Sequence, residues 1–405
     1  MKKVLILASY SCVTPLHGGQ IRLSEIIKSY QAAGHAVQSL NLYSMMSVGR
    51  GSHDFNYPLD TPWRLWQGRS VPLIEDLTSG RYAAGDEEAY ARLTRAVEGV
   101  PDVIQVEQPW LFPLVARWRR EGVFPGATIV YSSHNVEAPL KLAILRQYGI
   151  PEAEQIAAEI DALERQACEL ADVVLAVSRS DCQVLGAWCR QPVVLAANGI
   201  AAWPRVERDM AAWRGRLPQQ PFPLFVGSAH PPNISGFFEV FGESLGFLPP
   251  DTRLCVLGSV GAHLPENPRM QRWLPLNLSR LQVLGVVDEA GLAAVKNLAH
   301  VIVLPITEGG GSNIKTAEAL YSGKHVLGTP VSFRGFDAYL GMPGVHVAEP
   351  GRPFREKLRE LLQAPPLAPA APDLELRQSL LWRHTLAPMV SAVDQHLQSR
   401  SNHVQ

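Results

Sequence analysis

Short apolar runs alternate with helical patterns along the chain, and this alternation constrains the fold more than any other feature. Each run is rich in Val, Ile and Leu, which is typical of strands that are buried on both faces of a parallel sheet. In the first half of the chain the runs are residues 4–8, 103–106, 127–131 and 173–177. Apolar residues at helical spacing predict helices over about residues 20–33 and 151–170. The sequence therefore predicts an α/β fold with helices on both faces of a parallel sheet.

The pattern restarts in the second half of the chain, so we expect two domains. New apolar runs are residues 224–226, 254–257, 283–285 and 301–304. Between the two sets lie the turn residues Asn198 and Gly199 and a proline-rich stretch, and 405 residues exceed what one hydrophobic core usually organises. We predict an N-terminal domain over residues 1–197 and a C-terminal domain over residues 198–372.

Two further segments carry structural expectations. The sequence APPLAPAAP after Leu362 predicts an extended connection, and one last helix is predicted over about residues 373–398. The segment 373–405 is expected to pack back on the N-terminal domain. Residues 44–80 contain Tyr57, Trp63 and Trp66 in an irregular pattern, which favours a long loop region that lines a cleft.

Composition excludes several classes of protein. With 37 basic and 38 acidic residues, the chain has no net field that would attract nucleic acid. Its five cysteines never form a CxxC pair, which indicates neither a disulfide framework nor a zinc site and suits a reducing compartment. The N-terminal apolar run breaks at Ser9 as a strand would, and none of the apolar runs reaches the roughly 18 residues of a membrane span. We expect a cytoplasmic protein, and peripheral contact with the inner face of a membrane stays open.

The segment after the apolar run 301–304 carries the strongest chemical signal. A strand, the glycines 309–311 and a helix from about Asn313 follow one another, so backbone N–H groups at the helix start can approach an anion. Ser312 can cap this helix, and Lys315 adds a positive charge in its first turn. The spacing does not match a P-loop, and no GxGxxG follows the first strand, so a dinucleotide dehydrogenase is disfavoured. We predict a diphosphate site for a ligand with one nucleotide.

Glu318 lies three residues after Lys315, on nearly the same face of the predicted helix. Its carboxylate can accept two hydroxyl hydrogen bonds from a ribose. An ordinary surface ion pair between Lys315 and Glu318 is the alternative, and the sequence leaves both open.

These residues resemble a known family, the GT-B glycosyltransferases and especially glycosyltransferase family 4. Residues 316–329, TAEALYSGKHVLGT, are similar to the family's glycine-rich stretch, Glu-Ala-Leu helix and following turn. Weaker similarities follow in the family's order: residues 15–20 with Arg22, 133–137, 171–178, 198–200, 225–228 with Asn233, 256–258 and 285–288. The resemblance implies two Rossmann-like domains that face each other across a cleft. It also implies a nucleotide-sugar donor in the C-terminal domain, a carbohydrate or lipid-linked acceptor in the N-terminal domain, a retained anomeric configuration, and no metal or other cofactor.

The resemblance and the sheet-edge positions together select the candidate site. The expected catalytic residues are His134, Glu308 and Lys315. The expected donor-binding residues are Gly18, Gly19, Gly227, Ser228, Asn233, Gly310, Gly311, Ser312, Asn313, Ile314, Lys315 and Glu318. Gly18 and Gly19 precede a helix and offer free amides, or serve only as a tight turn, and His134 follows the apolar run 127–131 at the sheet edge where ligands bind.

The chain departs from the family pattern in two places. Many members have two glutamates separated by seven residues, but Gly310 stands eight positions before Glu318, and Glu308 stands ten before it. A basic pair is also common after the first strand of the second domain, where this chain has only His230 and Asn233. We expect Lys315 to supply the missing charge.

Other functions remain open at this point. An inverting transferase would need a base, for which His134 or Glu137 are candidates. A nucleotide-sugar epimerase of the same fold, or a binding protein with a degenerate site, is also compatible with these residues. Arg117, Arg119 and Arg120 surround Trp118 and could contact anionic lipid, although a solvated helix face is the more ordinary interpretation.

Overall fold

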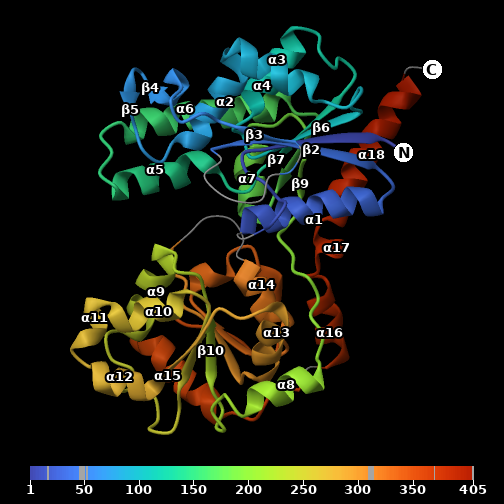
Figure 1. Cartoon of the computed structure of the whole chain (residues 1–405). Helices are drawn as coiled ribbons and strands as arrows, with labels where there is room; N and C mark the ends of the chain where they lie inside the picture. Colours follow the sequence, from blue (N-terminus) through green and yellow to red (C-terminus); the bar gives the residue numbers. More distant parts are fainter. Residues whose placement is uncertain (16–17, 45–50, 52, 309–313, 369, 404–405) are drawn as a thin grey trace. The chain divides into compact units, whose positions relative to one another are not determined.

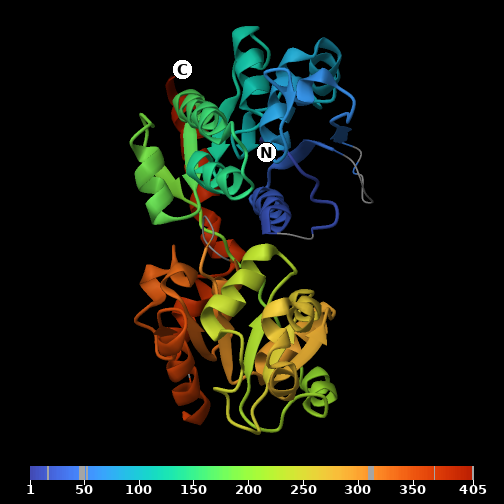
Figure 2. The same cartoon turned by 90° about the vertical axis from the view of Figure 1, so that its left-hand side faces the viewer.

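The computed structural model describes residues 1–405 except 16–17, 45–50, 52, 309–313, 369 and 404–405 (Figure 1). The chain divides into two compact units. Unit 1 comprises residues 1–197 and 385–405, and unit 2 comprises residues 198–384. Each unit has its own parallel sheet with helices on either side of it (Figures 1 and 2).

Unit 1 is built on a seven-stranded parallel sheet in the order β3-β2-β1-β6-β7-β8-β9. The strands are β1 (Lys3–Ala8), β2 (Ala36–Tyr43), β3 (Asp54–Asn56), β6 (Val103–Glu107), β7 (Thr128–Ser132), β8 (Val173–Ala176) and β9 (Val193–Leu195). The helices are α1 (Gly18–Ala32), α2 (Glu75–Gly85), α3 (Glu87–Arg95), α4 (Phe112–Arg120), α5 (Glu137–Gln147), α6 (Ala153–Leu170), α7 (Arg179–Gly186) and α18 (Ala387–His403). The four predicted runs of this half form β1, β6, β7 and β8, whose apolar side chains are buried because helices cover the sheet.

Unit 2 repeats this plan with a six-stranded parallel sheet in the order β12-β11-β10-β13-β14-β15. The strands are β10 (Pro223–Val226), β11 (Leu254–Leu257), β12 (Leu281–Gly285), β13 (Val301–Leu304), β14 (His325–Gly328) and β15 (Val345–Val347). The helices are α8 (Glu207–Arg214), α9 (Pro231–Phe241), α10 (Val260–Glu266), α11 (Pro268–Gln271), α12 (Leu274–Arg280), α13 (Glu289–Leu298), α14 (Ile314–Tyr321), α15 (Arg352–Gln363), α16 (Ala371–Gln378) and α17 (Trp382–Thr385).

Both sheets reverse their strand order at one point. In unit 1 this point lies between β1 and β6, and in unit 2 between β10 and β13. The connections on its two sides leave in opposite directions, so loops at the carboxyl ends of these strands diverge and leave a crevice. The residues that follow β1, β6, β10 and β13 are therefore where each unit is expected to hold a ligand.

The single helix predicted over residues 373–398 is wrong. Residues 371–403 form α16, α17 and α18, and only α18 belongs to unit 1. Leu380 and Leu381 are buried in the unit 2 core, and Arg377 donates a hydrogen bond to the carbonyl of Leu320. Pro388, which lacks an N–H group, stands in the first turn of α18 and accounts for the fresh helix start.

Helix α18 is held in unit 1 by polar contacts along its length. Asp394 lies 3.1 Å from His35 Nε2, and Arg400 lies 3.3 Å from the Thr128 hydroxyl. Of residues 373–405, which the sequence analysis expected to pack on the N-terminal domain, residues 385–405 lie in unit 1 and residues 373–384 lie in unit 2.

The irregular loop expected over residues 44–80 is also partly wrong. Its last residues begin α2, and the segment before them contains β3, the 3-10 helix Pro62–Arg64 and the hairpin Leu65–Trp66 with Arg69–Ser70. Tyr57 and Trp66 are 0% and 3% exposed in the unit 1 core, so they do not line a cleft. The segment folds inward because its aromatic side chains bury more apolar area than a solvated loop would.

Candidate functional site

The carboxyl edge of the unit 2 sheet brings three predicted residues together. Ser228 lies in the loop after β10, Asn233 lies in the first turn of α9, and Lys315 lies in the first turn of α14, which follows β13. The Asn233 amide donates to the Ser228 carbonyl at 2.8 Å and contacts its hydroxyl at 3.3 Å. The Asn233 side-chain oxygen accepts from Lys315 Nζ at 2.6 Å. Asn233 thus links the loops of the two strands that flank the point of strand-order reversal.

The environment of Lys315 favours an anion. Burial lowers the pKa of Lys315 to about 8, and the Glu318 carboxylate opposes this shift only in part. The ammonium contacts the neutral amide oxygen of Asn233. A partly dehydrated ammonium gains more from a nearby negative charge than an exposed one does, because the local dielectric is lower. This edge is therefore suited to a diphosphate.

Glu318 pairs with a lysine that the sequence analysis did not consider. Its Oε2 lies 3.0 Å from Nζ of Lys296 on α13, and its side chain keeps 27% of its surface exposed. The ion pair of Glu318 is thus made with Lys296, and its charge also acts on Lys315. The Glu318 carboxylate is anchored from inside the unit and remains accessible from outside it.

Glu308 follows β13 and is exposed at the same edge. It accepts a hydrogen bond from the Ser235 hydroxyl of α9 at 3.2 Å. The neighbouring Gly236 allows α9 to lie directly on this segment, because a Cβ at position 236 would stand 2.2 Å from the Pro305 carbonyl oxygen. Close packing of α9 against residues 305–308 places Glu308 within reach of the loop after β10.

Gly227 allows two loops to pack closely, and its backbone amide is already hydrogen-bonded within unit 2. Its amide donates to the Leu257 carbonyl at 2.9 Å, and its carbonyl accepts from the Val260 amide at 3.2 Å. A Cβ on Gly258, whose φ is +98°, would stand 2.2 Å from the Gly227 carbonyl oxygen. The loops after β10 and β11 therefore touch backbone to backbone, and the sequence could not show that the Gly227 amide is already used.

The predicted glycine-rich anion trap falls outside the described residues. Gly310, Gly311, Ser312 and Asn313 belong to this part of the chain, whereas Ile314 is the first described residue of α14 and is half-buried.

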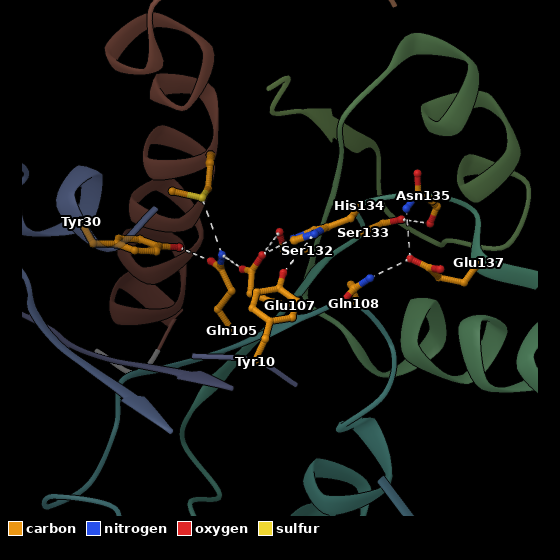
Figure 3. Close-up of polar contacts among 11 residues, drawn as sticks. Tyr10, Tyr30, Gln105, Glu107, Gln108, Ser132, Ser133, His134, Asn135 and Glu137 are labelled. Carbon is orange, nitrogen blue, oxygen red and sulfur yellow. Dashed lines mark hydrogen bonds and ion pairs between the residues drawn. The ribbon is translucent and has the colours of Figure 1, made fainter. Parts of the chain in front are cut away.

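A chain of polar side chains lies at the carboxyl edge of the unit 1 sheet (Figure 3). Glu107, the last residue of β6, is wholly buried, and its Oε2 lies 2.6 Å from His134 Nε2. The Tyr10 hydroxyl lies 3.2 Å from His134 Nδ1. Gln105 and Ser132 also donate to the Glu107 carboxylate, at 2.6 and 3.1 Å. Three side chains thus hold one buried carboxylate behind the loop that carries His134.

The protonation of this network follows from its charges. Burial alone would raise the pKa of Glu107, but His134 and the buried cation of Arg22 hold it below its usual value. Burial lowers the pKa of His134, and Glu107 opposes that effect. We assign an ionised Glu107 beside a cationic Arg22 and a neutral His134, which donates from Nε2 and accepts from Tyr10 at Nδ1. Both ring nitrogens contact protein groups, so in this state His134 orients its neighbours, and its contact with a donor sugar hydroxyl stays a prediction.

Two more carboxyl groups are buried nearby. Glu164 on α6 accepts from the backbone amides of Glu137 and Ala138 at 2.8 and 2.9 Å, which caps the start of α5. Glu137 accepts from Gln108 and Asn135 at 3.0 and 3.3 Å. Burial raises the pKa of Glu137 and of Glu164 to about 7, and their hydrogen-bond donors oppose part of the shift. Glu137 therefore has the protonation behaviour of a general base or acid near neutral pH.

The start of α1 lies at the same end of unit 1. Gly18 and Gly19 form its first turn, which contains no acidic residue, and Arg22 follows one turn later with 1% of its surface exposed. The helix follows β1, so its first amides lie near the point of strand-order reversal.

Two of the three arginines in the basic run on α4 make contacts within unit 1. Arg117 pairs with Glu87 and Glu121 at 2.8 and 2.7 Å, and Arg119 donates to the Leu170 carbonyl at 2.9 Å. Trp118 is 1% exposed, so it is a core residue and does not present its ring to a lipid surface. The described helices include none long and apolar enough to cross a membrane. Within the described ranges, no group of three or more His, Cys, Asp or Glu side chains is arranged to hold a metal ion.

Comparison with known proteins connects this geometry to a family. Residues 17–199 match the glycosyl transferase 4-like domain. Sucrose-phosphate synthase from Thermosynechococcus elongatus superposes with a TM-score of 0.70 at 15% identity, over 98% of this chain and 100% of that one. The chain is a glycosyltransferase of the GT-B fold.

Other GT-B structures agree with this assignment. WaaG, a glycosyltransferase involved in lipopolysaccharide biosynthesis, superposes with a TM-score of 0.59 at 15% identity, over 96% of this chain and 98% of that one. Anabaena HepE in complex with UDP and glucose does so with a TM-score of 0.58 at 14% identity, over 100% and 99% of the two chains. Curated protein sequences give no match. At these identities the structural likenesses establish the fold, and the site of this GT-B glycosyltransferase must be argued from its own residues.

Sequence reasoning missed the residues that support the site from behind. Glu107 and Lys296 are distant in sequence from the residues they touch, which are His134 and Glu318. One signal was available for Glu107, because a charged residue that directly ends a buried parallel strand stands at the ligand-binding edge. No comparable signal marks Lys296.

Proposed function

We propose that this glycosyltransferase moves a sugar from a nucleoside diphosphate sugar to a carbohydrate or lipid-linked acceptor. The product belongs to the synthesis of a cell-surface polysaccharide or glycoconjugate, on the cytoplasmic side of the membrane. Unit 2 binds the donor nucleotide, and unit 1 binds the acceptor. The reaction retains the anomeric configuration and requires no metal.

One observation carries the proposal. Lys315 and Asn233 lie 2.6 Å apart at the carboxyl edge of the unit 2 sheet, and Glu318 lies three residues after Lys315 on α14. The Lys315 cation suits the diphosphate of a nucleotide, and the accessible Glu318 carboxylate, one helical turn later, suits the hydroxyl groups of its ribose. HepE in complex with UDP and glucose, and starch synthase IV from Arabidopsis thaliana bound to ADP and acarbose, share this fold, which supports a nucleotide as the ligand.

The residues of unit 2 then have separate roles. Lys315 neutralises charge that develops on the diphosphate as the glycosidic bond breaks, together with the backbone amides of residues 310–313. Glu318 accepts hydrogen bonds from the ribose hydroxyls. Glu308, held by Ser235, contacts the donor sugar. Ser228 and Asn233 keep Lys315 in place.

The residues of unit 1 handle the sugar hydroxyls. Gly18 and Gly19 offer the first amides of α1 to an anionic group of the ligand. His134, held between Glu107 and Tyr10, fixes the shape of the edge where the transferred sugar lies.

Binding of free nucleotides is the first test. UDP, GDP, ADP, CDP and dTDP are titrated into the full chain by calorimetry, and one of them should bind with a Kd in the micromolar range, about −8 kcal/mol. Lys315→Met and Glu318→Gln should each weaken that binding. Unchanged binding in both variants would remove the assignment of the nucleotide to this edge.

The proposed retention of the anomeric configuration is tested on the sugar that the enzyme releases. Nucleoside diphosphate sugars are screened for slow hydrolysis, and the anomer of the released sugar is read by NMR. Retention is expected at the moment of release. An inverted product would assign Glu137, with its pKa of about 7, as the base and overturn retention.

Two other activities are separated by the same assay. Incubating a donor sugar nucleotide without acceptor and finding an epimerised sugar would favour an epimerase over a transferase. Nucleotide binding without any turnover on a panel of donors and acceptors would favour a binding protein.

A further inference from the structure

The interior of unit 2 holds a charged group that the proposed chemistry does not use. Lys296 lies on α13, and its side chain is 4% exposed. Its Nζ lies 3.0 Å from Glu318 Oε2 and so connects α13 to α14, which lie beside each other in unit 2 (Figure 1). An ammonium group loses its hydration on burial, so a lysine in this position needs compensation from the protein.

A pair of aromatic rings packs beside the lysine end of this ion pair. Lys296 Nζ lies 4.6 Å from the centre of the Trp203 ring, and Trp203 meets Tyr321 edge to face at 4.8 Å. Tyr321 stands three residues after Glu318 and so lies on the same side of α14. The rings lower the local dielectric around Lys296, whereas the Glu318 side chain remains 27% exposed. The ion pair is therefore buried at its lysine end and open at its carboxylate end.

Stability alone does not explain a lysine here. A methionine of similar length would fill the same space without losing hydration, and replacing buried ion pairs by apolar residues is often neutral or stabilising. What the lysine adds is a fixed orientation of the Glu318 carboxylate. A carboxylate that is already oriented loses less conformational entropy when it binds a ligand.

We propose that Lys296 is a positioning residue for the nucleotide ribose. Through its ion pair it holds Glu318 ready to accept hydrogen bonds from the 2′ and 3′ hydroxyls, and it thereby sets the preference of the site for ribonucleotides over 2′-deoxyribonucleotides. This inference rests on the proposed function, in which Glu318 binds the ribose.

The experiment compares each nucleotide with its deoxy form. The nucleoside diphosphate that binds most tightly among UDP, GDP and ADP is titrated together with its 2′-deoxy counterpart into the full chain. Wild type should prefer the ribonucleotide by about tenfold, because a hydroxyl that donates to a carboxylate is worth a charge-assisted hydrogen bond. Lys296→Met should weaken ribonucleotide binding by about tenfold and reduce the ribo-to-deoxy ratio to less than threefold.

A double variant tests whether Lys296 acts through Glu318. If it does, Lys296→Met should have no further effect on nucleotide affinity in a Glu318→Gln background, since the group it positions is gone. Additive effects of the two substitutions would overturn the inference.

Each failure has a separate signature. If Glu318→Gln leaves the affinity and the ribo-to-deoxy ratio unchanged, the proposed ribose site itself is wrong. If Glu318→Gln lowers both and Lys296→Met lowers neither, the ribose site stands and the positioning role of Lys296 is wrong.

A matched control separates positioning from stability. Lys141 in unit 1 is also a poorly exposed lysine, with Nζ 2.5 Å from Asp76, and Lys141→Met should leave the ribo-to-deoxy ratio at its wild-type value. If Lys296→Met does not fold, Lys296→Gln takes its place, because the amide still donates to Glu318 but carries no charge. A ribo-to-deoxy ratio equal to wild type in that variant would overturn the charge-based positioning.

Discussion

The two sheets share a strand topology but differ in the charges buried at their carboxyl edges. Unit 1 buries the carboxyl groups of Glu107, Glu137 and Glu164 there, whereas the corresponding edge of unit 2 carries the poorly hydrated ammonium group of Lys315. The backbone plan thus decides where each unit can bind a ligand, and the side chains decide what kind of ligand it is. This difference supports the proposal that unit 2 binds the donor nucleotide and that carboxyl groups of unit 1 handle protons and hydroxyl groups.

The largest expected effect lies in unit 1. Glu107→Gln should lower the free energy of unfolding by about 3 kcal/mol, because it leaves the buried cation of Arg22 without its neighbouring carboxylate. Denaturant unfolding at pH 7 measures this. Glu121→Gln, at the more exposed pair with Arg117, is the control and should change little. If the two substitutions lower the free energy of unfolding equally, the buried network around Glu107 contributes no more to stability than an exposed ion pair does.

The next effect tests the anion site of unit 2. Lys315→Met should weaken nucleoside diphosphate binding about 30-fold, since a charge-assisted hydrogen bond in a poorly hydrated place is lost. Calorimetric titration gives the Kd. Lys357→Met removes a lysine that pairs with Glu360 on α15 and should have no effect on binding. An affinity unaffected by Lys315→Met would move the anion site away from α14.

The pH dependence of nucleotide binding also tests whether Lys315 contacts the diphosphate. The pKa of Lys315 is lowered to about 8, and a bound diphosphate raises it, so the protonated form binds more tightly. Affinity should hold below about pH 8 and fall as pH rises above it, by up to tenfold per unit. Titrations between pH 7.5 and 9.5 follow this slope, and Lys315→Met should abolish it. A slope that persists in the variant would point to another group.

A smaller effect concerns the opposite end of the unit 2 sheet. The ring centres of His300 and His325 lie 5.4 Å apart, and those of His325 and His346 lie 5.9 Å apart. Burial lowers the pKa of His300 and of His346 below the usual value. The unfolded chain therefore binds protons at a higher pH than the folded one does, and stability should fall as pH drops below about 6.5.

Melting temperatures between pH 7.5 and 5 measure this loss, which His346→Gln should reduce by about 2 to 4 °C. The exposed His263 serves as the control, and His263→Gln should leave the pH dependence unchanged. Identical pH profiles for both variants would show that the row of histidines does not govern acid stability.

The last prediction is that removing divalent metal ions has no effect on the transfer rate. Treatment with EDTA should leave the transfer rate unchanged, because Lys315 supplies the positive charge that a divalent cation provides in other diphosphate sites. Loss of activity that Mg²⁺ or Mn²⁺ restores would contradict the assignment of that charge to Lys315.

Much of the fold could be predicted from the sequence because its signals are local. Residues 103–106 and 301–304 are apolar without alternation, and that pattern belongs to strands buried on both faces wherever they occur. The C-terminal helix was misjudged because its apolar spacing continues through residues whose packing partners differ. Leu381 belongs to the unit 2 core, and Met389 contacts Gln105 in unit 1. Only the tertiary structure shows that residues 371–403 form three helices shared between the two units.

The candidate site was predictable to a lesser degree. Ser228, Asn233 and Lys315 follow strands that flank one point of strand-order reversal, so residue type and position along the chain were sufficient to select them. The protonation of His134 was not predictable, because it depends on Glu107, which is 27 residues away in sequence and 2.6 Å away in space.

The sequence by itself determined the two parallel sheets and the presence of a cation and a carboxylate on α14. The tertiary structure alone decided that Glu318 pairs with Lys296, that Gly227 uses its amide within the fold, and that Tyr57 and Trp66 belong to the core. The physical reason is that strand and helix patterns depend on neighbouring residues, whereas burial, ion pairing and pKa depend on groups that folding brings together from distant parts of the chain.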